Sequence, residues 1–426
     1  MNKVRFASRR EFIQTGAKGM AAAAILSSCS GPPAPRETAS AKAPSTVRSL
    51  GRTGFRLPVV SVGTTYAPDL VRAAIDAGIR YVHTSSSYAE RNHERMLGQA
   101  LSGLARDRFV IGTSPDLPYR FPGGGSPSMD VGQGVDPALI ARSMHASLET
   151  LGVDHVDIYY LASVGTGRSA LHAPYIDAFQ KLKRDGLTRF IGIVTHSNEP
   201  EVIRAAVESR AWDVVVTAYN FRQSHRDEVA SAIAEADSAG LGVIAMKTQA
   251  GVYWDRFRRR KINMKAALRW VLQNEHVHTT IPAFSNYDEL KEDLEVLGAP
   301  ALTPADRADL GLGRAAGLPG VFCQQCGRCL AQCPGGMNVP ALMRASMYAF
   351  GYQQPERARQ VLHTWTRGDV TCASCQRCDV CCALGLDVRG TALAMVEEGS
   401  GVFPLCTHSM IPPQPLIGSS SLNPRL

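Results

Sequence analysis

Nine of the eleven cysteines of this 426-residue chain lie in two short runs near its carboxyl end. The first run has the spacing C-x2-C-x2-C-x3-C and consists of Cys323, Cys326, Cys329 and Cys333. The second repeats the spacing and then doubles its last cysteine, with Cys372, Cys375, Cys378, Cys381 and Cys382. Three thiolates on one short loop can meet three corners of an iron–sulfur cube. The spacing therefore predicts two 4Fe-4S clusters.

The first run, with Pro334 after its last cysteine, resembles the run of bacterial ferredoxins. In two-cluster ferredoxins the fourth cysteine of each run binds the other cluster. The resemblance implies one cluster on Cys323, Cys326, Cys329 and Cys382, and another on Cys372, Cys375, Cys378 and Cys333. Cys381 competes with Cys382 for the fourth position, and Cys406 stands apart as an inert thiol.

Zinc and disulfides are the alternative uses of these cysteines. Zinc ribbons place two cysteines on each knuckle, whereas each run here has at least four. Disulfides suit an exported protein, but cysteines so close in sequence would close small, strained loops.

The first residues indicate export. Ser8–Gln14 contains paired arginines ahead of a short, Ala-rich apolar stretch, and it resembles a twin-arginine signal. Residues 26–29, Leu-Ser-Ser-Cys, resemble a lipobox, which makes Cys29 the expected lipidated residue of a membrane-anchored lipoprotein on the periplasmic or extracytoplasmic face. The alternative is an ordinary signal cut elsewhere, with Cys29 discarded. Residues 1–29 are then the signal and 30–47 a flexible linker.

From residue 48 to 300, β-branched runs alternate with helical patterns. Eight such pairs predict an α/β protein with a (β/α)8 TIM barrel, whose chemistry lies at the carboxyl ends of the strands. A doubly wound sheet is the alternative, although no G-x-G-x-x-G follows the first strand. The expected strands are Val59–Val62, Tyr81–Thr84, Phe109–Thr113, Val156–Leu161, Phe190–Val194, Val214–Ala218, Gly242–Met246 and Thr279–Ile281. The long insert Pro115–Gly134 is expected to be a lid or a surface loop.

Residues 301–410 form the expected dicluster domain, a small α-helical and loop ferredoxin-like unit, with a helix starting at Asn338–Pro340. Residues 411–426 form the expected disordered tail.

Within the expected barrel, several motifs resemble the aldo/keto reductase superfamily, and the resemblance covers about residues 49–296. In family order they are Leu50–Gly54, Ala77–Val82, Glu94 with Leu97–Leu101, Leu151–Asp154, Asp157–Tyr159, Ala245–Thr248 and Ile281–Leu294. The most similar branch carries an iron–sulfur extension.

The resemblance implies hydride transfer from a nicotinamide to a carbonyl, with a Tyr acid, a Lys–Asp pair that lowers its pKa and an orienting His. Only the Tyr is present, as Tyr88. The Asp position holds His83, the Lys position Ser114 and the His position Ala162. Ordinary NADPH-dependent carbonyl reduction is therefore not expected. Tyr88 and His83 should share one strand mouth, where they form either a changed proton-transfer site or a rim aromatic beside a buried histidine.

The residues that align with the family's nicotinamide contacts also differ, because Val194, Thr195 and Val216 stand there. The phosphate end is partly kept. Its residues are Lys247, Ser285, Asn286 and Glu292, with Asp293 in place of an Asn. NADP binding is therefore doubtful.

The formal net charge of +8 includes +4 from the first 29 residues, and no basic block is interleaved with aromatic residues. A nucleic-acid partner is not expected. The leading hypothesis is an exported iron–sulfur oxidoreductase that serves a redox partner protein or a small-molecule substrate. The alternative is a non-catalytic electron-carrier or docking subunit, with the barrel as scaffold.

Overall fold

Seven strands, β3 to β9, form one parallel sheet in which sequence neighbours are also spatial neighbours. The computed structural model describes residues 46–88, 91–117, 130–250, 261–315, 323, 329–351, 378–382 and 386–397, together with 355, 358, 359, 361 and 362. The strands are β3 (Tyr81–His83), β4 (Val110–Thr113), β5 (Val156–Leu161), β6 (Thr188–Thr195), β7 (Val214–Ala218), β8 (Gly242–Met246) and β9 (Thr279–Thr280).

Residues 59–63 join the two edges of this sheet. Val60 forms a parallel bridge with Thr280 and Val62 forms one with Val82. The Ser61 amide donates to the Thr280 carbonyl at 2.8 Å, and the Val62 amide donates to the Tyr81 carbonyl at 2.9 Å. The curled sheet therefore has the arrangement of a (β/α)8 barrel, and its unbroken order excludes a doubly wound sheet, in which the order reverses.

The prediction that Val59–Val62 forms a regular strand is wrong. Its neighbours β3 and β9 are only three and two residues long, so each supplies a single bridge. Before it, an antiparallel hairpin that we did not predict pairs β1 (Val47–Ser49) with β2 (Arg56–Pro58).

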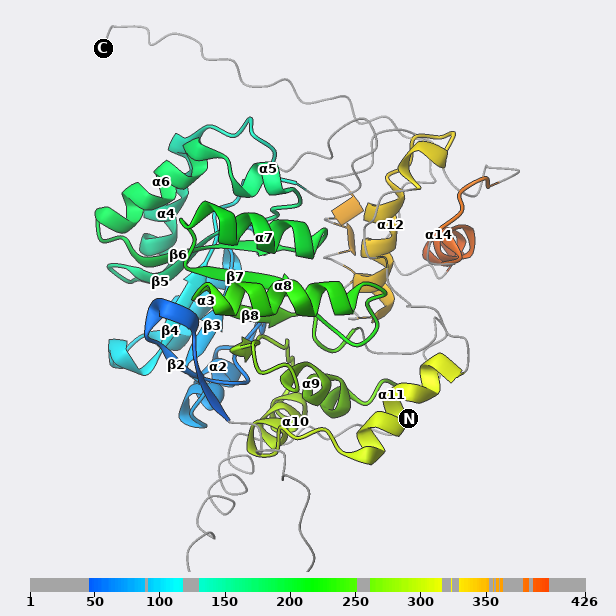
Figure 1. Ribbon diagram of the computed structural model, residues 1–426, viewed down its shortest axis with the longest axis horizontal. Coiled ribbons are helices and arrows are strands. Elements are labelled where there is room, and N and C mark those ends of the chain that lie inside the picture. Colours follow the sequence, from blue (N-terminus) through cyan, green and yellow to red (C-terminus); the bar gives the residue numbers. More distant parts are fainter. Residues whose placement is uncertain are drawn as a thin grey trace, which may run out of the picture.

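Helices surround the strands (Figure 1). They are α2 (Pro68–Asp76), α3 (Asn92–Leu101), α4 (Pro137–Leu151), α5 (Gly167–Ala170), α6 (Ala173–Arg184), α7 (Glu199–Ser209), α8 (Arg226–Ser238), α9 (Met264–Leu272), α10 (Tyr287–Gly298) and α11 (Pro304–Ala315). The start of α4 shows the expected local cause, because the Asp136 side chain accepts from the Ala138 amide at 2.9 Å and Pro137 occupies the first turn.

Two further helices, α12 (Val339–Ser346) and α14 (Val388–Glu397), belong to the cysteine-rich region. The predicted start of α12 is confirmed, since the Asn338 side chain caps it by accepting from the Ala341 amide at 3.0 Å. The two helices share an apolar cluster that includes Leu342, Ala392 and Met395. In Figure 1 they stand beside one end of the barrel, next to the ends of α7 and α8.

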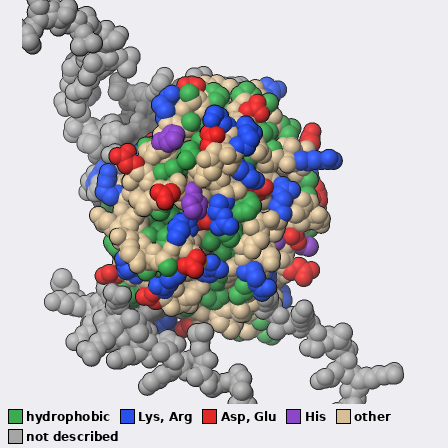
Figure 2. Space-filling view, turned by 90° about the vertical axis from the view of Figure 1, so that its left-hand side faces the viewer, with side chains coloured by type: hydrophobic (Ala, Val, Ile, Leu, Met, Phe, Trp, Pro, Cys, Tyr) green, Lys and Arg blue, Asp and Glu red, His purple; other side chains and the backbone are tan. Residues whose placement is uncertain are grey.

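No helix within the described ranges is long and apolar enough to cross a membrane. The face of the molecule drawn in Figure 2 carries Lys and Arg interspersed with Asp and Glu. The signal with Cys29, residues 30–45 of the expected linker and the tail lie outside the described residues, whereas Val47, the last residue of the expected linker, belongs to β1.

Two phenols, Tyr81 and Tyr160, are the largest side chains of the apolar cluster inside the barrel, and they require glycine on the neighbouring strands. A Cβ added at Gly112 would lie 2.3 Å from the hydroxyl of Tyr81 and 2.7 Å from a ring carbon of Tyr160. One added at Gly192 would lie 2.5 Å from the Val214 carbonyl oxygen and 2.8 Å from the Tyr160 ring. Both tyrosines are fully buried, so the space that the two glycines leave is the space that the rings use.

We therefore predict that Gly112→Ala lowers the free energy of unfolding by about 2–3 kcal/mol, the cost of overpacking a rigid core. Urea unfolding followed by circular dichroism measures it. Gly134→Ala is the matched control, because nothing lies within 4 Å of the added carbon there. Equal effects of the two substitutions would contradict this account of the barrel interior.

Candidate functional site

Tyr81, Tyr160 and His83 form a hydrogen-bonded chain inside the barrel. The Tyr81 hydroxyl lies 2.8 Å from the Tyr160 hydroxyl and 2.9 Å from Nδ1 of His83. If Tyr160 donates to Tyr81 and Tyr81 donates to Nδ1, every hydroxyl proton in the chain has an acceptor. That order leaves the proton of His83 on Nε2.

Burial keeps these three hydrogen-bonded side chains neutral. Desolvation, helped by nearby His93, lowers the pKa of His83 to about 3. Desolvation likewise raises the pKa of Tyr81 well above its usual value, and the nearby phenols of Tyr160 and Tyr88 raise it further. His83 therefore offers a neutral N–H donor at physiological pH and is not a charged acid.

Tyr88 lies in the turn after β3, half-buried, with its ring edge-on to the His93 ring at a centroid distance of 5.8 Å. The Tyr88 amide donates to the Ser85 carbonyl at 3.0 Å, so Tyr88 stands in the turn directly after the strand that ends at His83. The structure thus brings His83 and Tyr88 to one strand mouth, as the sequence predicts. Position 114, where the resemblance to the superfamily implies a lysine, holds a serine.

Ser114 instead belongs to a chain of hydroxyls. Its Oγ donates to Ser85 Oγ at 2.8 Å, and Ser85 Oγ lies 2.8 Å from Ser87 Oγ. Ser86 adds two hydrogen bonds to the Ser114 carbonyl, one from its amide and one from its hydroxyl, each 3.0 Å long. Ser114 therefore holds the loop that carries Tyr88. The Ala162 position offers no polar side chain.

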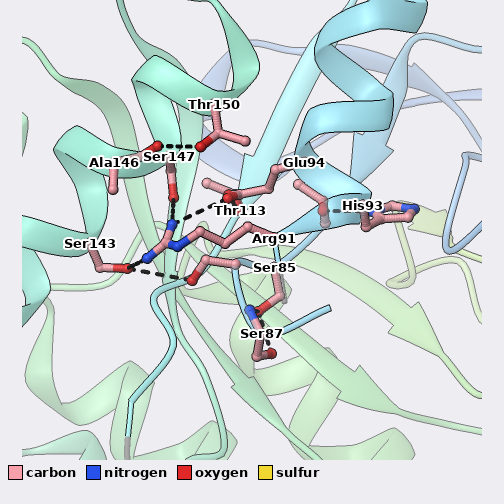
Figure 3. A network of polar contacts seen from close by, with 12 residues as sticks. Ser85, Ser87, Arg91, His93, Glu94, Thr113, Ser143, Ala146, Ser147 and Thr150 are labelled. Atoms are coloured by element: carbon pink, nitrogen blue, oxygen red, sulfur yellow. Dashed lines mark hydrogen bonds and ion pairs between the residues drawn. The ribbon is translucent and has the colours of Figure 1, made fainter. Parts of the chain in front are cut away.

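A buried ion pair supports the same loop from behind (Figure 3). Glu94 accepts from the Thr113 hydroxyl at 2.8 Å and pairs with Arg91 at 3.4 Å. Arg91 also donates to Ser143 and Ser147 on α4. Burial raises the pKa of Glu94, although these donors lower it. The family motif residue Glu94 is thus a support for the mouth and does not face it.

His93, which sequence reasoning missed, has both ring nitrogens in use. Nδ1 lies 2.7 Å from the Thr84 hydroxyl and Nε2 lies 2.7 Å from the Thr65 carbonyl oxygen. Because a carbonyl only accepts, Nε2 carries the proton. His93 therefore serves to orient the Tyr88 ring.

The long insert returns to the barrel at Asp130, and residues 118–129 lie outside the described residues. The buried Asp130 carboxylate accepts from the Gly165 amide at 2.9 Å, from the Thr166 hydroxyl at 3.1 Å and from the Ser169 hydroxyl at 2.8 Å. This end of the insert is anchored to the loop after β5.

The predicted phosphate-end residues already have partners within the protein. The amide and hydroxyl of Ser285 both donate to Glu289, at 2.6 and 2.9 Å. The Asn286 side chain caps α10 by accepting from the Glu289 amide at 2.9 Å. Glu292 is exposed on α10, and buried Asp293 has its pKa raised well above the usual value by desolvation and by neighbouring Glu292 and Glu289. A phosphate here would have to displace a carboxylate.

Lys247 occupies a different place, the loop directly after β8, with a φ of 54°. It follows Met246, the last residue of the strand. It therefore stands, like Ser285 and Asn286 in the loop after β9, at the carboxyl end of the sheet.

The two cysteine runs meet in the structure. The Cys381 amide donates to Gln332 Oε1 at 2.7 Å, across 49 positions of sequence. Buried Cys329 forms an apolar cluster with Val339, Met343 and Val388, and partly buried Cys323, Cys333 and Cys382 pack against it. Cys381 is exposed. Cysteines of both runs thus pack around one cluster of apolar side chains at the start of α12.

The described cysteines, which include Cys378, carry no disulfide. Within the described part of the chain no three His, Cys, Asp or Glu side chains are arranged to hold a metal ion. Three of the eight predicted ligands, Cys326, Cys372 and Cys375, lie outside that part.

Comparison with known proteins gives the same assignment for the barrel. Residues 59–266 match the model of the aldo/keto reductase family. This barrel belongs to the aldo/keto reductase superfamily. The L-galactose dehydrogenase of Arabidopsis thaliana is 31% identical in an alignment 164 residues long, which covers 34% of this chain and 47% of that protein. An aldo-keto reductase of Mycobacterium sp. (strain MCS) is 27% identical over 257 residues, 57% of this chain and 82% of that protein. The chain thus spans about half the length of the first of these relatives.

Solved aldo-keto reductase structures share the fold. The enzyme from Bacillus halodurans in its holo form gives a TM-score of 0.50 at 23% identity and covers 63% of this chain and 96% of its own. The Klebsiella pneumoniae enzyme in complex with NADPH gives 0.50 at 20% identity, covering 63% and 95%.

The loop after β7 of this aldo/keto reductase barrel is held by a buried carboxylate. Gln223 accepts from the Asn220 amide at 2.9 Å and donates to Glu199 at 3.1 Å. His225 Nε2 lies 2.9 Å from the second oxygen of Glu199. The hydrogen bond to Glu199 raises the pKa of His225, against the opposing effect of burial.

This raised pKa predicts a pH-dependent stability. A histidine whose folded pKa is raised stabilises the fold fully below its unfolded pKa of about 6.5 and loses that contribution as the pH rises through the folded value. The stability difference between wild type and His225→Gln should therefore be larger at pH 5.5 than at pH 9, as measured by urea unfolding at both pH values. The exposed His145 on α4 supplies the control His145→Gln, which should show no such trend.

Proposed function

We propose that this chain is an exported iron–sulfur oxidoreductase of the aldo/keto reductase superfamily, in which two 4Fe-4S clusters exchange electrons with a pocket at the carboxyl end of the barrel. The observation that carries the proposal is the meeting of the two cysteine runs around one apolar cluster at the start of α12, beside the barrel. Export by the twin-arginine route and a lipid anchor at Cys29 are part of the proposal.

The proximity of the two cysteine runs supports such clusters, while the described residues alone bring no three of the expected ligands together around a metal. Cys323, Cys329 and Cys382 come from both runs and pack against the same apolar residues, as the crossed ligation of two-cluster ferredoxins requires. The exposed position of Cys381 favours Cys382 as the fourth ligand. Bound clusters would supply one-electron storage in an apolar setting, which tunes their potential.

The barrel residues support a changed pocket in place of an ordinary carbonyl reductase site. A Tyr acid that serves hydride transfer needs a nearby positive charge to lower its pKa. The Ser114 hydroxyl is uncharged and donates to Ser85, which lies 2.8 Å from Ser87. His83 can hold a substrate oxygen through Nε2–H, but a pKa of about 3 prevents it from donating a proton as an acid at neutral pH.

NADP does not fit the phosphate end of this chain. Ser285 donates both of its hydrogens to Glu289, and a carboxylate repels the phosphate that would replace it. The Klebsiella pneumoniae structure contains NADPH, but its identity of 20% supports the fold alone.

A second candidate function is a non-catalytic electron carrier or docking subunit with the barrel as scaffold. The observation that favours it is the internal satisfaction of the pocket: Tyr81, Tyr160 and Nδ1 of His83 bond to one another.

The full-length protein, purified under anaerobic conditions, should contain about eight irons and about eight acid-labile sulfides. Cys329→Ser should lose about half of the iron, because one of two clusters loses a buried ligand. Cys406→Ser, outside both runs, is the matched control and should keep all of it. Zinc without sulfide in the wild type would refute the clusters.

Electron paramagnetic resonance separates the sources of electrons. Dithionite should produce reduced-cluster signals in the full-length protein, whereas NADPH at millimolar concentration should produce none. Signals that appear with NADPH would contradict the stated misfit at Ser285 and would restore the ordinary cofactor of the superfamily.

A further inference from the structure

The β1–β2 hairpin closes the amino end of the barrel. Leu50 and Leu57 belong to the apolar cluster inside the barrel. The Arg52 amide donates to the Gly240 carbonyl at 2.8 Å, and the Arg52 guanidinium donates to the Trp212 carbonyl. Gly240 and Trp212 come two residues before the first residues of β8 and β7. The hairpin therefore lies at the end opposite the mouth, and Figure 1 shows β2 and α12 on opposite sides of the barrel.

The part of the chain that carries the expected lipid reaches the barrel at this same end. Thr46 is the first described residue, and its carbonyl accepts from the Val59 amide at 3.0 Å, at the start of the segment that joins the two edges of the sheet. Sixteen residues, 30–45, separate Thr46 from Cys29. Even fully extended, a chain of that length spans only about 55 Å. A lipid on Cys29 would therefore keep the amino end of the barrel close to the membrane.

Two buried carboxylates at this end each bind two cations. Asp157 pairs with Arg106 at 2.7 Å and with Arg189 at 3.1 Å, and it also accepts from the Ile111 amide. Asp213 pairs with Lys183 at 2.6 Å and with Arg52 at 3.4 Å. The side chains of the two carboxylates are 1% and 8% exposed, whereas those of the four cations are 31–51% exposed. The negative charge thus lies beneath the positive charge.

The cations exceed what the carboxylates need. Arg56 on β2 is exposed beside this group, so five cations stand over two carboxylates and leave a net charge of +3. We call this surface the basic face; its residues are Arg52, Arg56, Arg106, Lys183 and Arg189. In the segments that lead into β3, β4, β5 and β6, charges of the two signs balance, with Asp76, Asp107, Asp154 and Asp185 against Arg80, Arg108, Lys181 and Arg184. Figure 2 looks onto this side of the molecule, where Lys and Arg side chains are spread across the surface.

Aromatic rings lie among the cations of the basic face. Phe55 and Phe190 are partly buried, and their ring centroids are 5.4 Å apart. The Arg189 guanidinium lies 4.6 Å from the centroid of Phe55, and the Lys183 ammonium lies 5.3 Å from that of Phe190. Basic and aromatic side chains together are typical of protein surfaces that lie in the headgroup layer of a membrane.

We propose that the basic face docks on the anionic phospholipid headgroups of the membrane to which the lipid on Cys29 anchors the protein. The inference rests on the proposed function, which includes that anchor. Docking in this orientation turns the mouth of the barrel and α12 away from the membrane. A redox partner or substrate then reaches them from the aqueous side.

The size of the charge suits orientation of a tethered protein. Each basic residue close to an anionic lipid surface strengthens binding about fivefold. Three net charges therefore favour this face by roughly a hundredfold over a neutral one. Stable attachment of a lipidated protein commonly combines an acyl chain with such a basic patch.

Arginine labelling tests the orientation on the full-length lipidated protein. The protein is reconstituted on vesicles of phosphatidylcholine, with or without about 30% phosphatidylglycerol to supply the anionic surface, and treated with phenylglyoxal. Mass spectrometry then measures the labelling rate of each arginine. On the anionic vesicles, labelling of Arg52, Arg56 and Arg189 should slow on the order of tenfold, and 1 M salt should restore it because the Debye length falls to about 3 Å. Arg389, exposed on α14, is the internal reference and should label equally on both vesicle types.

A charge variant with a matched control tests the cause. Arg56→Gln combined with Arg189→Gln removes two of the three net charges, so the protection of Arg52 on anionic vesicles should disappear. Arg142→Gln combined with Arg204→Gln removes two exposed arginines from α4 and α7, with side chains 64% and 47% exposed, and should leave that protection unchanged. Circular dichroism confirms that each variant is folded.

Equal labelling of the basic face on both vesicle types, or equal loss of protection in the two double variants, overturns the docking surface. Flotation of the vesicles keeps this result apart from the proposed function. Wild type that floats with phosphatidylcholine vesicles while Cys29→Ala does not supports the anchor, and unprotected arginines on the floating protein then refute the basic face alone. Cys29→Ala that floats as wild type does refutes the anchor itself, and iron content, measured on the same samples, tests the clusters independently.

Discussion

The structure depends on how the inside of the barrel is filled. Two tyrosine rings occupy it, and they fit only because β4 and β6 carry Gly112 and Gly192 where any side chain would collide. Their hydroxyls cannot reach water, so they must bond to each other and to His83. The same packing therefore keeps His83 neutral and leaves its proton on Nε2.

The loops at that mouth are supported from outside the pocket. Three buried carboxylates bind groups of these loops. Glu94 pairs with Arg91, Asp130 accepts from the loop after β5, and Glu199 contacts Gln223 and His225. Satisfied carboxylates in these places fix the loops in strained conformations, and the cost is offset by their hydrogen bonds. Within the described residues, the loops after β6, β7 and β8 keep buried polar atoms without a hydrogen-bond partner.

The cysteine-rich domain and the barrel complement each other chemically. An ordinary site of the superfamily brings a lysine to its tyrosine, whereas here Ser114 joins a hydroxyl chain. This arrangement fits our proposal that electrons come from the cysteine-rich domain.

The sequence by itself determined what depends on local pattern. The order of strands, the helix caps at Asp136 and Asn338, and the superfamily of the barrel follow from spacing and residue type, because each is decided within a few neighbouring residues. The placement of His83 and Tyr88 at one mouth also followed, since both come directly after the same strand. The clusters, the lipid anchor and the export route stay predictions.

Only the tertiary structure decided the rest. Val59–Val62 forms bridges in place of a strand because its partners, 20 and 220 positions away, are too short. The hydrogen bonds from Ser285 to Glu289 could not be predicted from the sequence, because a carboxylate four residues after a serine is common. Arg52, Arg106, Lys183 and Arg189 are unremarkable in their own segments. They gain meaning only when closure of the barrel brings these charges from distant parts of the chain around Asp157 and Asp213.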